Sequence, residues 1–106
     1  MIITMKNYYV YILRCSDKSY YTGITNDLDR RIMEHNSGVD KKSYTFTRRP
    51  VELVYKESFQ NPNDAIIWEK RIKGWSRKKK EALINSDFKE LKRLSNLRRH
   101  TSTGSV

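Results

Sequence analysis

The side chains of this sequence that are best suited to chemistry are two tyrosines, one arginine, one histidine and one glutamate: Tyr11, Tyr21, Arg31, His35 and Glu69. A guanidinium presents a fixed fork of donors that suits a phosphate, and a carboxylate can hold a cation. Each residue alone is weak evidence, since tyrosines are common in strands. Their combination indicates one reaction class, with charge stabilised at a polyanionic substrate.

Glu69 is the most unusual of the five because it lies within an apolar stripe. The segment 65–75 is predicted to be a helix whose stripe contains Ala65, Ile72 and Trp75, and Glu69 falls between them at helical spacing. A carboxylate in such a place must be paired, neutral or bound to a cation. From the residues alone, an internal ion pair with Arg31 or Lys73 is the favoured interpretation.

A β-hairpin is predicted to position the two tyrosines. Residues 9–15 form a strand that is apolar on both faces, which indicates a central strand, and residues 20–25 form its partner. Gly23 interrupts the second strand, which indicates the close approach of another group. Residues paired across a hairpin share a face, so a loop with an odd number of residues, or a bulge, would bring Tyr11 and Tyr21 together. We predict a hairpin loop with an odd number of residues.

A helix is predicted to follow the hairpin and to position Arg31 and His35. Thr25 or Asn26 is expected to cap it. Leu28 and Ile32 form the apolar stripe that the arginine and the histidine border, Arg30 points away into solvent, and Ser37-Gly38 ends the helix with Gly38 in a left-handed conformation.

These segments resemble the GIY-YIG nuclease family. Tyr9-Val10-Tyr11 is similar to the GIY half of the motif, Tyr21-Thr22-Gly23 to the YIG half, and NDLDRRIMEHN to the helix that follows. The resemblance covers residues 7–85 and is strongest to the small stand-alone bacterial members. Two residues differ from the motif: Tyr9 replaces the first glycine, and Thr22 replaces the second isoleucine.

The resemblance implies an α/β fold, in which a three-stranded and mainly antiparallel sheet is flanked by helices. It also implies a divalent-metal-dependent endonuclease that hydrolyses phosphodiester bonds in DNA during repair, recombination or processing. Glu69 would be the ligand of one Mg²⁺ or Mn²⁺ ion, which suits a single carboxylate because Mg²⁺ keeps several waters and shares its shell with phosphate. No small-molecule cofactor is expected.

The family also implies roles for the other residues. A tyrosine is the proposed general base, and we place Tyr11 first and Tyr21 second in that role. Arg31 would contact the scissile phosphate, and His35 would support Arg31 or a phosphate oxygen. Tyr9 and Gly23 are expected to shape the site. A tyrosine near its reference pKa of about 10 is a poor base at neutral pH, so we expect the metal and Arg31 to lower that pKa.

The composition indicates a nucleic-acid partner. The formal charge is +10, from 22 Lys and Arg against 12 Asp and Glu in 106 residues. No segment is apolar and long enough for a membrane, no signal peptide is recognisable, and the single cysteine, Cys15, cannot form an internal disulfide. We expect a cytoplasmic protein and favour a monomer.

A basic loop at residues 39–50 is the expected contact to nucleic acid. It interleaves aromatic residues with Lys41, Lys42, Arg48 and Arg49. A solvated connection whose aromatics pack into the core is the equally favoured alternative. Lys73, one turn after the glutamate, is a further phosphate contact or a solvated cation.

The remaining chain is predicted to complete one domain over residues 1–97, with a motif core at 7–85. A strand at 51–59 is expected at a sheet edge, and a helix opening at residues 61–64 carries the glutamate. Ser76 is expected to cap a third helix, and Ser86 to start a helical extension over residues 86–97. Residues 98–106 are predicted to be a disordered tail.

Two other functions are compatible with the sequence. A non-catalytic nucleic-acid-binding module would explain the charge, the basic loop and the departures at Tyr9 and Thr22. A protein-interaction domain that uses the last helix is a weaker hypothesis.

Overall fold

The computed structural model describes residues 7–104, with side chains up to residue 96. The chain divides into two compact units, Met1–Lys73 and Gly74–Val106. Every residue expected to act in catalysis belongs to the first unit. Each unit is therefore described by itself.

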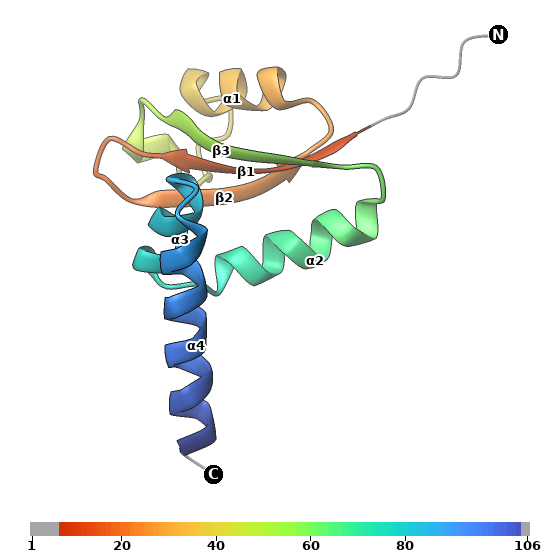
Figure 1. Ribbon diagram of the computed structural model, residues 1–106. Coiled ribbons are helices and arrows are strands. Elements are labelled where there is room, and N and C mark those ends of the chain that lie inside the picture. The colour runs from red at the N-terminus through yellow and green to blue at the C-terminus, as the bar shows by residue number, and fades with distance from the viewer. Residues whose placement is uncertain (1–6, 105–106) are drawn as a thin grey trace, which may run out of the picture. The chain divides into compact units, whose positions relative to one another are not determined.

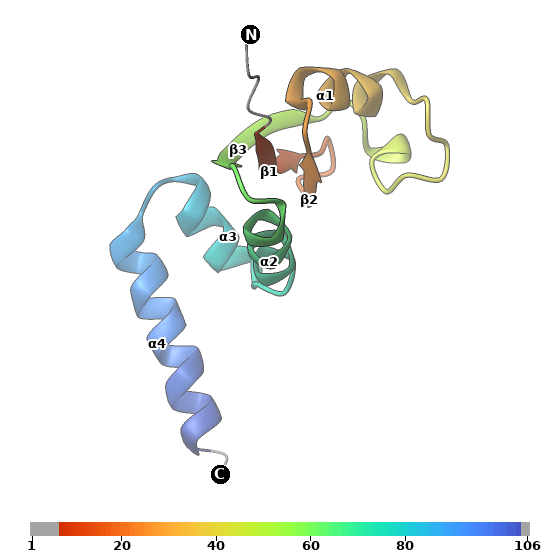
Figure 2. The ribbon, with the colours of Figure 1, turned by 90° about the vertical axis from the view of Figure 1, so that its right-hand side faces the viewer.

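The first unit is a three-stranded antiparallel sheet with helices on its two faces. The strand order is β2-β1-β3, and α1 and α2 lie on opposite sides of the sheet (Figures 1 and 2). This arrangement confirms the predicted fold class. The elements are β1 (Tyr8–Arg14), β2 (Tyr20–Thr25), α1 (Leu28–Ser37), the short 3-10 helix η1 (Phe46–Arg48), β3 (Glu52–Phe59) and α2 (Pro62–Lys73).

The central strand β1 is covered on both faces, as its sequence predicted. Val10 and Ile12 on one face and Tyr11 and Leu13 on the other are all fully buried. Leu28 and Ile32 of α1 pack on the face that carries Tyr11. The edge strand β3 is largely exposed over its second half, which is consistent with its predicted edge position.

The hairpin between β1 and β2 has the odd loop length that the sequence predicted. Arg14 pairs with Tyr20, so five residues form the loop. Tyr11 is paired with Gly23 and Leu13 with Tyr21. Because paired residues share a face, the two tyrosines lie on the same side of the sheet.

The ends of α1 are set by Asp27 and Gly38. The carboxylate of Asp27 accepts a hydrogen bond from the backbone N–H of Arg30 at 3.2 Å, so Asp27 is the N-cap. The predicted caps were wrong: Thr25 instead accepts a hydrogen bond from the Asp27 N–H, and Asn26 lies before the cap. Gly38 has a φ of 73°, and its N–H donates to Glu34 O, which confirms the predicted left-handed end.

The second unit contains α3 (Arg77–Ile84) and α4 (Phe88–Gly104). Ser76 caps α3 as predicted, since its hydroxyl accepts from the N–H of Lys79. Asp87 rather than Ser86 begins α4, because the Asp87 carboxylate accepts from the Glu90 N–H whereas Ser86 has a positive φ of 55°. The helix continues to Gly104, into the segment 98–106 predicted to be disordered, whose last two residues lie outside the described part.

No helix in the described part of the chain has the length and apolar character needed to cross a bilayer.

Candidate active site

The hydroxyl group of Tyr11 lies at the centre of the candidate site. Tyr11 is fully buried, and its ring lies across Gly23 of the neighbouring strand. A Cβ atom at position 23 would be only 2.5 Å from Cζ of Tyr11. Glycine is therefore required here by a close approach, as the sequence predicted, and the approaching group is the Tyr11 phenol.

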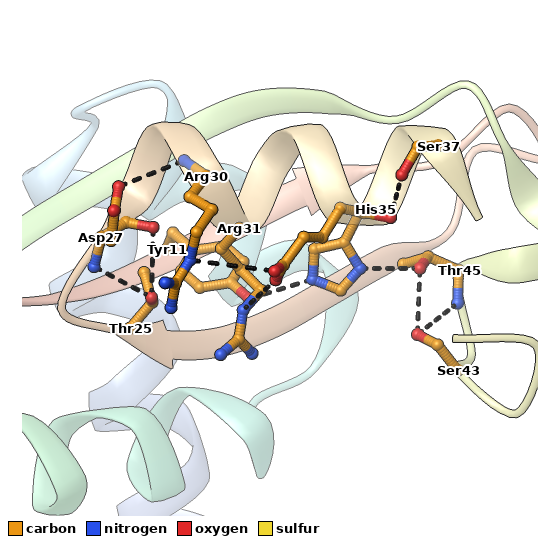
Figure 3. Close-up of polar contacts among 10 residues, drawn as sticks. Tyr11, Thr25, Asp27, Arg30, Arg31, His35, Ser37, Ser43 and Thr45 are labelled. Carbon is orange, nitrogen blue, oxygen red and sulfur yellow. Dashed lines mark hydrogen bonds and ion pairs between the residues drawn. The ribbon is translucent and has the colours of Figure 1, made fainter. Parts of the chain in front are cut away.

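A chain of hydrogen bonds joins Tyr11 to the loop that follows α1 (Figure 3). The Tyr11 hydroxyl is 3.1 Å from Nε2 of His35, and Nδ1 of His35 is 2.7 Å from Oγ1 of Thr45. Ser43 extends the chain, with its Oγ 3.0 Å from Oγ1 of Thr45. His35 is 8% exposed and Thr45 is 1% exposed, so water has little access to these bonds.

Tyr21 contacts the same group of residues through its ring. Its centroid is 5.0 Å from that of His35 and 6.3 Å from that of Tyr11. On its other side it stacks on Tyr44, at 6.3 Å between centroids and 23° between planes. The hairpin, α1 and the loop 39–50 thus meet at Tyr21.

Arg31 borders this cluster with part of its guanidinium directed toward the site (Figure 3). Its side chain is 39% exposed, and Nε lies 3.3 Å from Oε1 of Glu34 in an ion pair. That Nε is buried and has no hydrogen bond to any described residue, because the ion pair lacks hydrogen-bond geometry. Arg30 is an exposed cation, as predicted, although it also pairs with Glu34 at 3.8 Å.

A cavity of about 230 Å³ opens beside these residues. It is lined by side chains of β2, α1 and the loop 39–50: Tyr21, Arg31, Glu34, His35, Val39, Asp40, Ser43 and Thr45. Tyr21, Arg31 and His35 thus lie at one cavity, and Tyr11 joins them through its bond to His35, while the catalytic roles of the four residues stay a prediction.

Burial controls the protonation of Tyr11 and His35. Burial raises the pKa of Tyr11 well above its usual range, and Tyr21 raises it further, while Arg31 lowers it. Arg31 thus lowers the pKa of Tyr11 as expected, but burial is the larger effect and the net shift is upward. Burial, assisted by the charge of Arg31, lowers the pKa of His35 below its ordinary value of 6.5, so the imidazole is neutral at pH 7.

Glu69 is buried on α2 and forms an ion pair within its own helix. Its Oε2 is 2.7 Å from Nζ of Lys73, and its side chain is 11% exposed. The hydrogen bond that Lys73 donates to Glu69 raises the pKa of Lys73, burial lowers it, and the charge of Tyr21 raises it to a smaller extent. Tyr21 therefore interacts with the Tyr11 cluster and, electrostatically, with Lys73.

Glu69 is the residue that would hold a Mg²⁺ or Mn²⁺ ion, because a carboxylate supplies the oxygen ligand that these ions prefer. In this structure one of its oxygens is paired with the Lys73 ammonium. Within the part of the chain that the structure describes, no three His, Cys, Asp or Glu side chains gather to form an all-protein metal cage. An ion here would share its shell with substrate oxygens.

The basic loop 39–50 differs from one of its two predicted forms, the connection whose aromatic residues pack into the core. Lys41 and Lys42 are exposed, as a nucleic-acid contact requires. Arg48 instead lies 3.8 Å from the Tyr44 ring centroid and bonds to Asp17, and Arg49 lies over Phe46 at 4.5 Å. The aromatic side chains therefore pair with the loop's own arginines and are not packed into the core. Nucleic-acid binding by Lys41, Lys42, Arg48, Arg49 and Lys73 stays a prediction.

Tyr9 lies away from the cluster, although it shares a sheet face with Tyr11. It lines a separate hollow at the start of α1 with Asn26, Asp27 and Lys56 among others. Its predicted role in shaping the site has no support in the contacts of the described residues.

The model of the GIY-YIG catalytic domain matches residues 7–82 of this sequence. The chain belongs to the GIY-YIG family. The match includes the hairpin, α1 and the helix that carries Glu69.

Relatives and solved structures agree with this assignment. A UPF0213 protein of Bacillus pumilus is 53% identical over 78 residues, which cover 74% of this chain and 79% of the relative. The UPF0213 protein BH0048 of Bacillus halodurans, solved by NMR, is 49% identical with a TM-score of 0.50 and covers 74% of this chain and 83% of its own. The protein EF2693 of E. faecalis, also solved by NMR, is 34% identical with a TM-score of 0.56 and covers 82% and 92%. These names state no activity.

Sequence reasoning missed Thr45, Ser43 and Glu34. Thr45 and Ser43 lie in a loop that was interpreted from its cations and aromatics alone. Glu34 faces Arg31 at the i+3 position, which is a recognisable helical pair.

Proposed function

We propose that this GIY-YIG protein is a divalent-metal-dependent endonuclease that hydrolyses phosphodiester bonds in nucleic acid, with DNA as the first substrate to test. The observation that carries the proposal is the convergence of Tyr21, Arg31 and His35 at one cavity, with the buried Tyr11 hydrogen-bonded to His35 and Gly23 making room for its phenol. Beside that cavity the buried Nε of Arg31 makes no hydrogen bond, and packing alone gives no reason to place an arginine there.

Hydrolysis requires that a water lose a proton as its oxygen attacks phosphorus and that the bond to the leaving oxygen break. Tyr11 acts as the base toward this water. As it takes the proton of the water, its own hydroxyl proton passes to Nε2 of His35, which is 3.1 Å away and neutral. The two transfers occur together, because burial raises the pKa of Tyr11 and lowers the pKa of His35, so a separate Tyr11 anion beside an imidazolium is unfavourable.

Arg31 stabilises the negative charge that develops on the phosphate oxygens. Arg31 lines the cavity, and its buried Nε makes no hydrogen bond, only an ion pair with Glu34. Glu69 would hold one Mg²⁺ or Mn²⁺, and such an ion would neutralise phosphate charge and lower the pKa of a bound water. Lys73 forms an ion pair with the Glu69 carboxylate.

The test is a cleavage assay on labelled duplex, single-stranded and branched DNA and on RNA, with Mg²⁺ or Mn²⁺. Arg31→Ala and Glu69→Gln are each expected to lower cleavage by about 100-fold or more, since each removes charge stabilisation at the reacting phosphate. Arg30→Ala is the matched control, because Arg30 is the neighbouring exposed arginine and pairs with the same Glu34. Equal cleavage by wild type, Arg31→Ala and Glu69→Gln would disprove the assignment.

A non-catalytic nucleic-acid-binding module is the second candidate. The observation that favours it is the Glu69–Lys73 ion pair at 2.7 Å, which neutralises the one carboxylate expected to hold a metal. Salt-sensitive binding without cleavage under any of the tested ions would support this alternative.

A further inference from the structure

Tyr11, the candidate base, is connected through His35 to Thr45, a residue with no assigned role. Thr45 belongs to the loop 39–50, whereas His35 lies on α1, and their polar atoms are 2.7 Å apart. Thr45 is the most buried polar residue of its loop, at 1% exposure. A threonine fully buried in a basic surface loop requires a reason, since burying an unsatisfied hydroxyl is costly.

The hydrogen bonds that join Tyr11, His35, Thr45 and Ser43 are compatible with two arrangements of their protons. In the first, Nδ1–H of His35 donates to Thr45, the Thr45 hydroxyl donates to Ser43, and Nε2 accepts from the Tyr11 hydroxyl. In the second, the Thr45 hydroxyl donates to Nδ1, and Nε2–H donates to the Tyr11 oxygen. Only the first lets His35 take a proton from Tyr11.

The surroundings of Tyr11 favour the first arrangement. The positive charge of Arg31 lowers the pKa of Tyr11, so it favours an arrangement in which the Tyr11 hydroxyl gives its proton to a partner. Nε2 of His35 is the partner within hydrogen-bond distance, at 3.1 Å, and a phenol O–H is a good donor whereas its oxygen is a weak acceptor. Ser43 Oγ meanwhile accepts the backbone N–H of Thr45 at 3.3 Å and lies within reach of the Thr45 hydroxyl.

We propose that Thr45 is a positioning residue of the active site: its hydroxyl accepts Nδ1–H of His35 and so fixes the tautomer whose bare Nε2 can take the proton of Tyr11. The partner of one imidazole nitrogen sets which proton the other carries. The step then balances: the O–H bond of Tyr11 breaks, an Nε2–H bond forms, and the resulting imidazolium donates from both nitrogens. The effect of Thr45 on catalysis rests on the proposed nuclease function, whereas the predicted tautomer of His35 does not depend on that function.

The charged and titratable groups around His35 come from every element packed against it. They are Tyr11 on β1, Tyr21 on β2, Arg31 and Glu34 on α1, and Asp40 in the loop. The two carboxylates oppose the effects of burial and Arg31. Since His35 must be neutral to accept the proton, the cleavage rate should fall as pH drops below the lowered pKa of His35.

The tautomer can be measured directly by ¹⁵N NMR of the imidazole nitrogens at pH 7.5. The sequence holds two histidines, so a His100→Gln background leaves His35 as the single signal source. Thr45→Val keeps the shape of the side chain and removes the hydroxyl, while Thr45→Ser retains it. We expect the Nδ1–H tautomer in the background protein and in Thr45→Ser, and a shift toward Nε2–H in Thr45→Val.

Cleavage kinetics give the second readout. Thr45→Val should lower kcat by about 100-fold with KM nearly unchanged, because a misdirected acceptor impairs the chemical step and not binding. Thr45→Ser should restore most of the rate. The amide spectrum of the same samples reports whether Thr45→Val is folded.

Two results would overturn the inference: an Nε2–H tautomer in the background protein, or an unchanged tautomer in folded Thr45→Val. Absence of cleavage by the wild type would refute the proposed nuclease instead, and the NMR result would still decide the role of Thr45. A tautomer that shifts while kcat does not would show that His35 takes no proton from Tyr11, which also overturns the positioning role.

Discussion

At the scale of single residues, the site depends on how tightly the Tyr11 phenol is enclosed. Gly23 gives it room, His35 bonds its hydroxyl, and Arg31 and Tyr21 influence its pKa. This enclosure has two opposite effects on the chemistry of Tyr11. Burial makes the phenol hard to ionise, and the same burial keeps its proton acceptor neutral and close.

Gly23→Ala should therefore destabilise the protein by about 1–3 kcal/mol, the usual cost of overpacking. The added methyl would overlap the Tyr11 ring, at 2.5 Å from Cζ. Urea unfolding of wild type, both single variants and the Tyr11→Ala/Gly23→Ala double variant measures the coupling. In the Tyr11→Ala background the Gly23→Ala cost should largely disappear, and an equal cost in both backgrounds would contradict a clash with the ring.

At the scale of elements, the loop 39–50 is tied to the rest of the first unit by side chains. Thr45 bonds to α1 through His35, and the Arg48 carbonyl accepts from both N–H and hydroxyl of Ser16 in the hairpin loop. The carboxamide of Asn36 closes the end of the loop, donating to Val51 O at 3.2 Å and accepting from Val51 N at 2.7 Å. The loop is thus held at three separate points.

Asn36→Ala should lower the free energy of unfolding by about 1–2 kcal/mol, because this substitution removes two hydrogen bonds to Val51. Amide hydrogen exchange of Val51 should become faster in the same variant. Ser37→Ala is the neighbouring control, since its bond to Glu34 O is exposed and stays within one helix. Comparable destabilisation by Ser37→Ala would argue against the tie to Val51.

The helices and strands could be predicted from the sequence, whereas the side-chain hydrogen bonds that hold the loop 39–50 could not. The apolar run at residues 9–15 and Gly38 predicted the hairpin and the end of α1, because such signals are local. The family motif then located Tyr11, Arg31 and His35. The bonds of Thr45 and Asn36 join residues that no local pattern connects, and the pairing of Arg48 with Tyr44 depends on a turn whose geometry the letters do not give.

At the scale of the whole molecule, the charge of +10 predicts binding that is dominated by interactions with phosphate groups. Lys41→Ala/Lys42→Ala should weaken binding to duplex DNA about equally for all sequences. The slope of log K against log salt should become shallower by about 1 for each lysine–phosphate ion pair that the substitutions remove. Fluorescence anisotropy at several salt concentrations measures this slope.

The matched control removes the same charge elsewhere, as Lys89→Ala/Lys92→Ala on α4. Both lysines are exposed. The loop pair is expected to change the slope more than the helix pair. Equal changes would mean that the charge acts as a whole and that the loop is not a preferred contact.

The five-residue turn between β1 and β2 has a consequence for how the chain can change in evolution. Because side chains alternate between faces, one inserted or deleted residue in this turn would rotate Tyr21 and Gly23 to the opposite side of the sheet. A change of two residues would leave both in place. The turn should therefore vary in length by even steps, so that the parity of its length is what selection maintains.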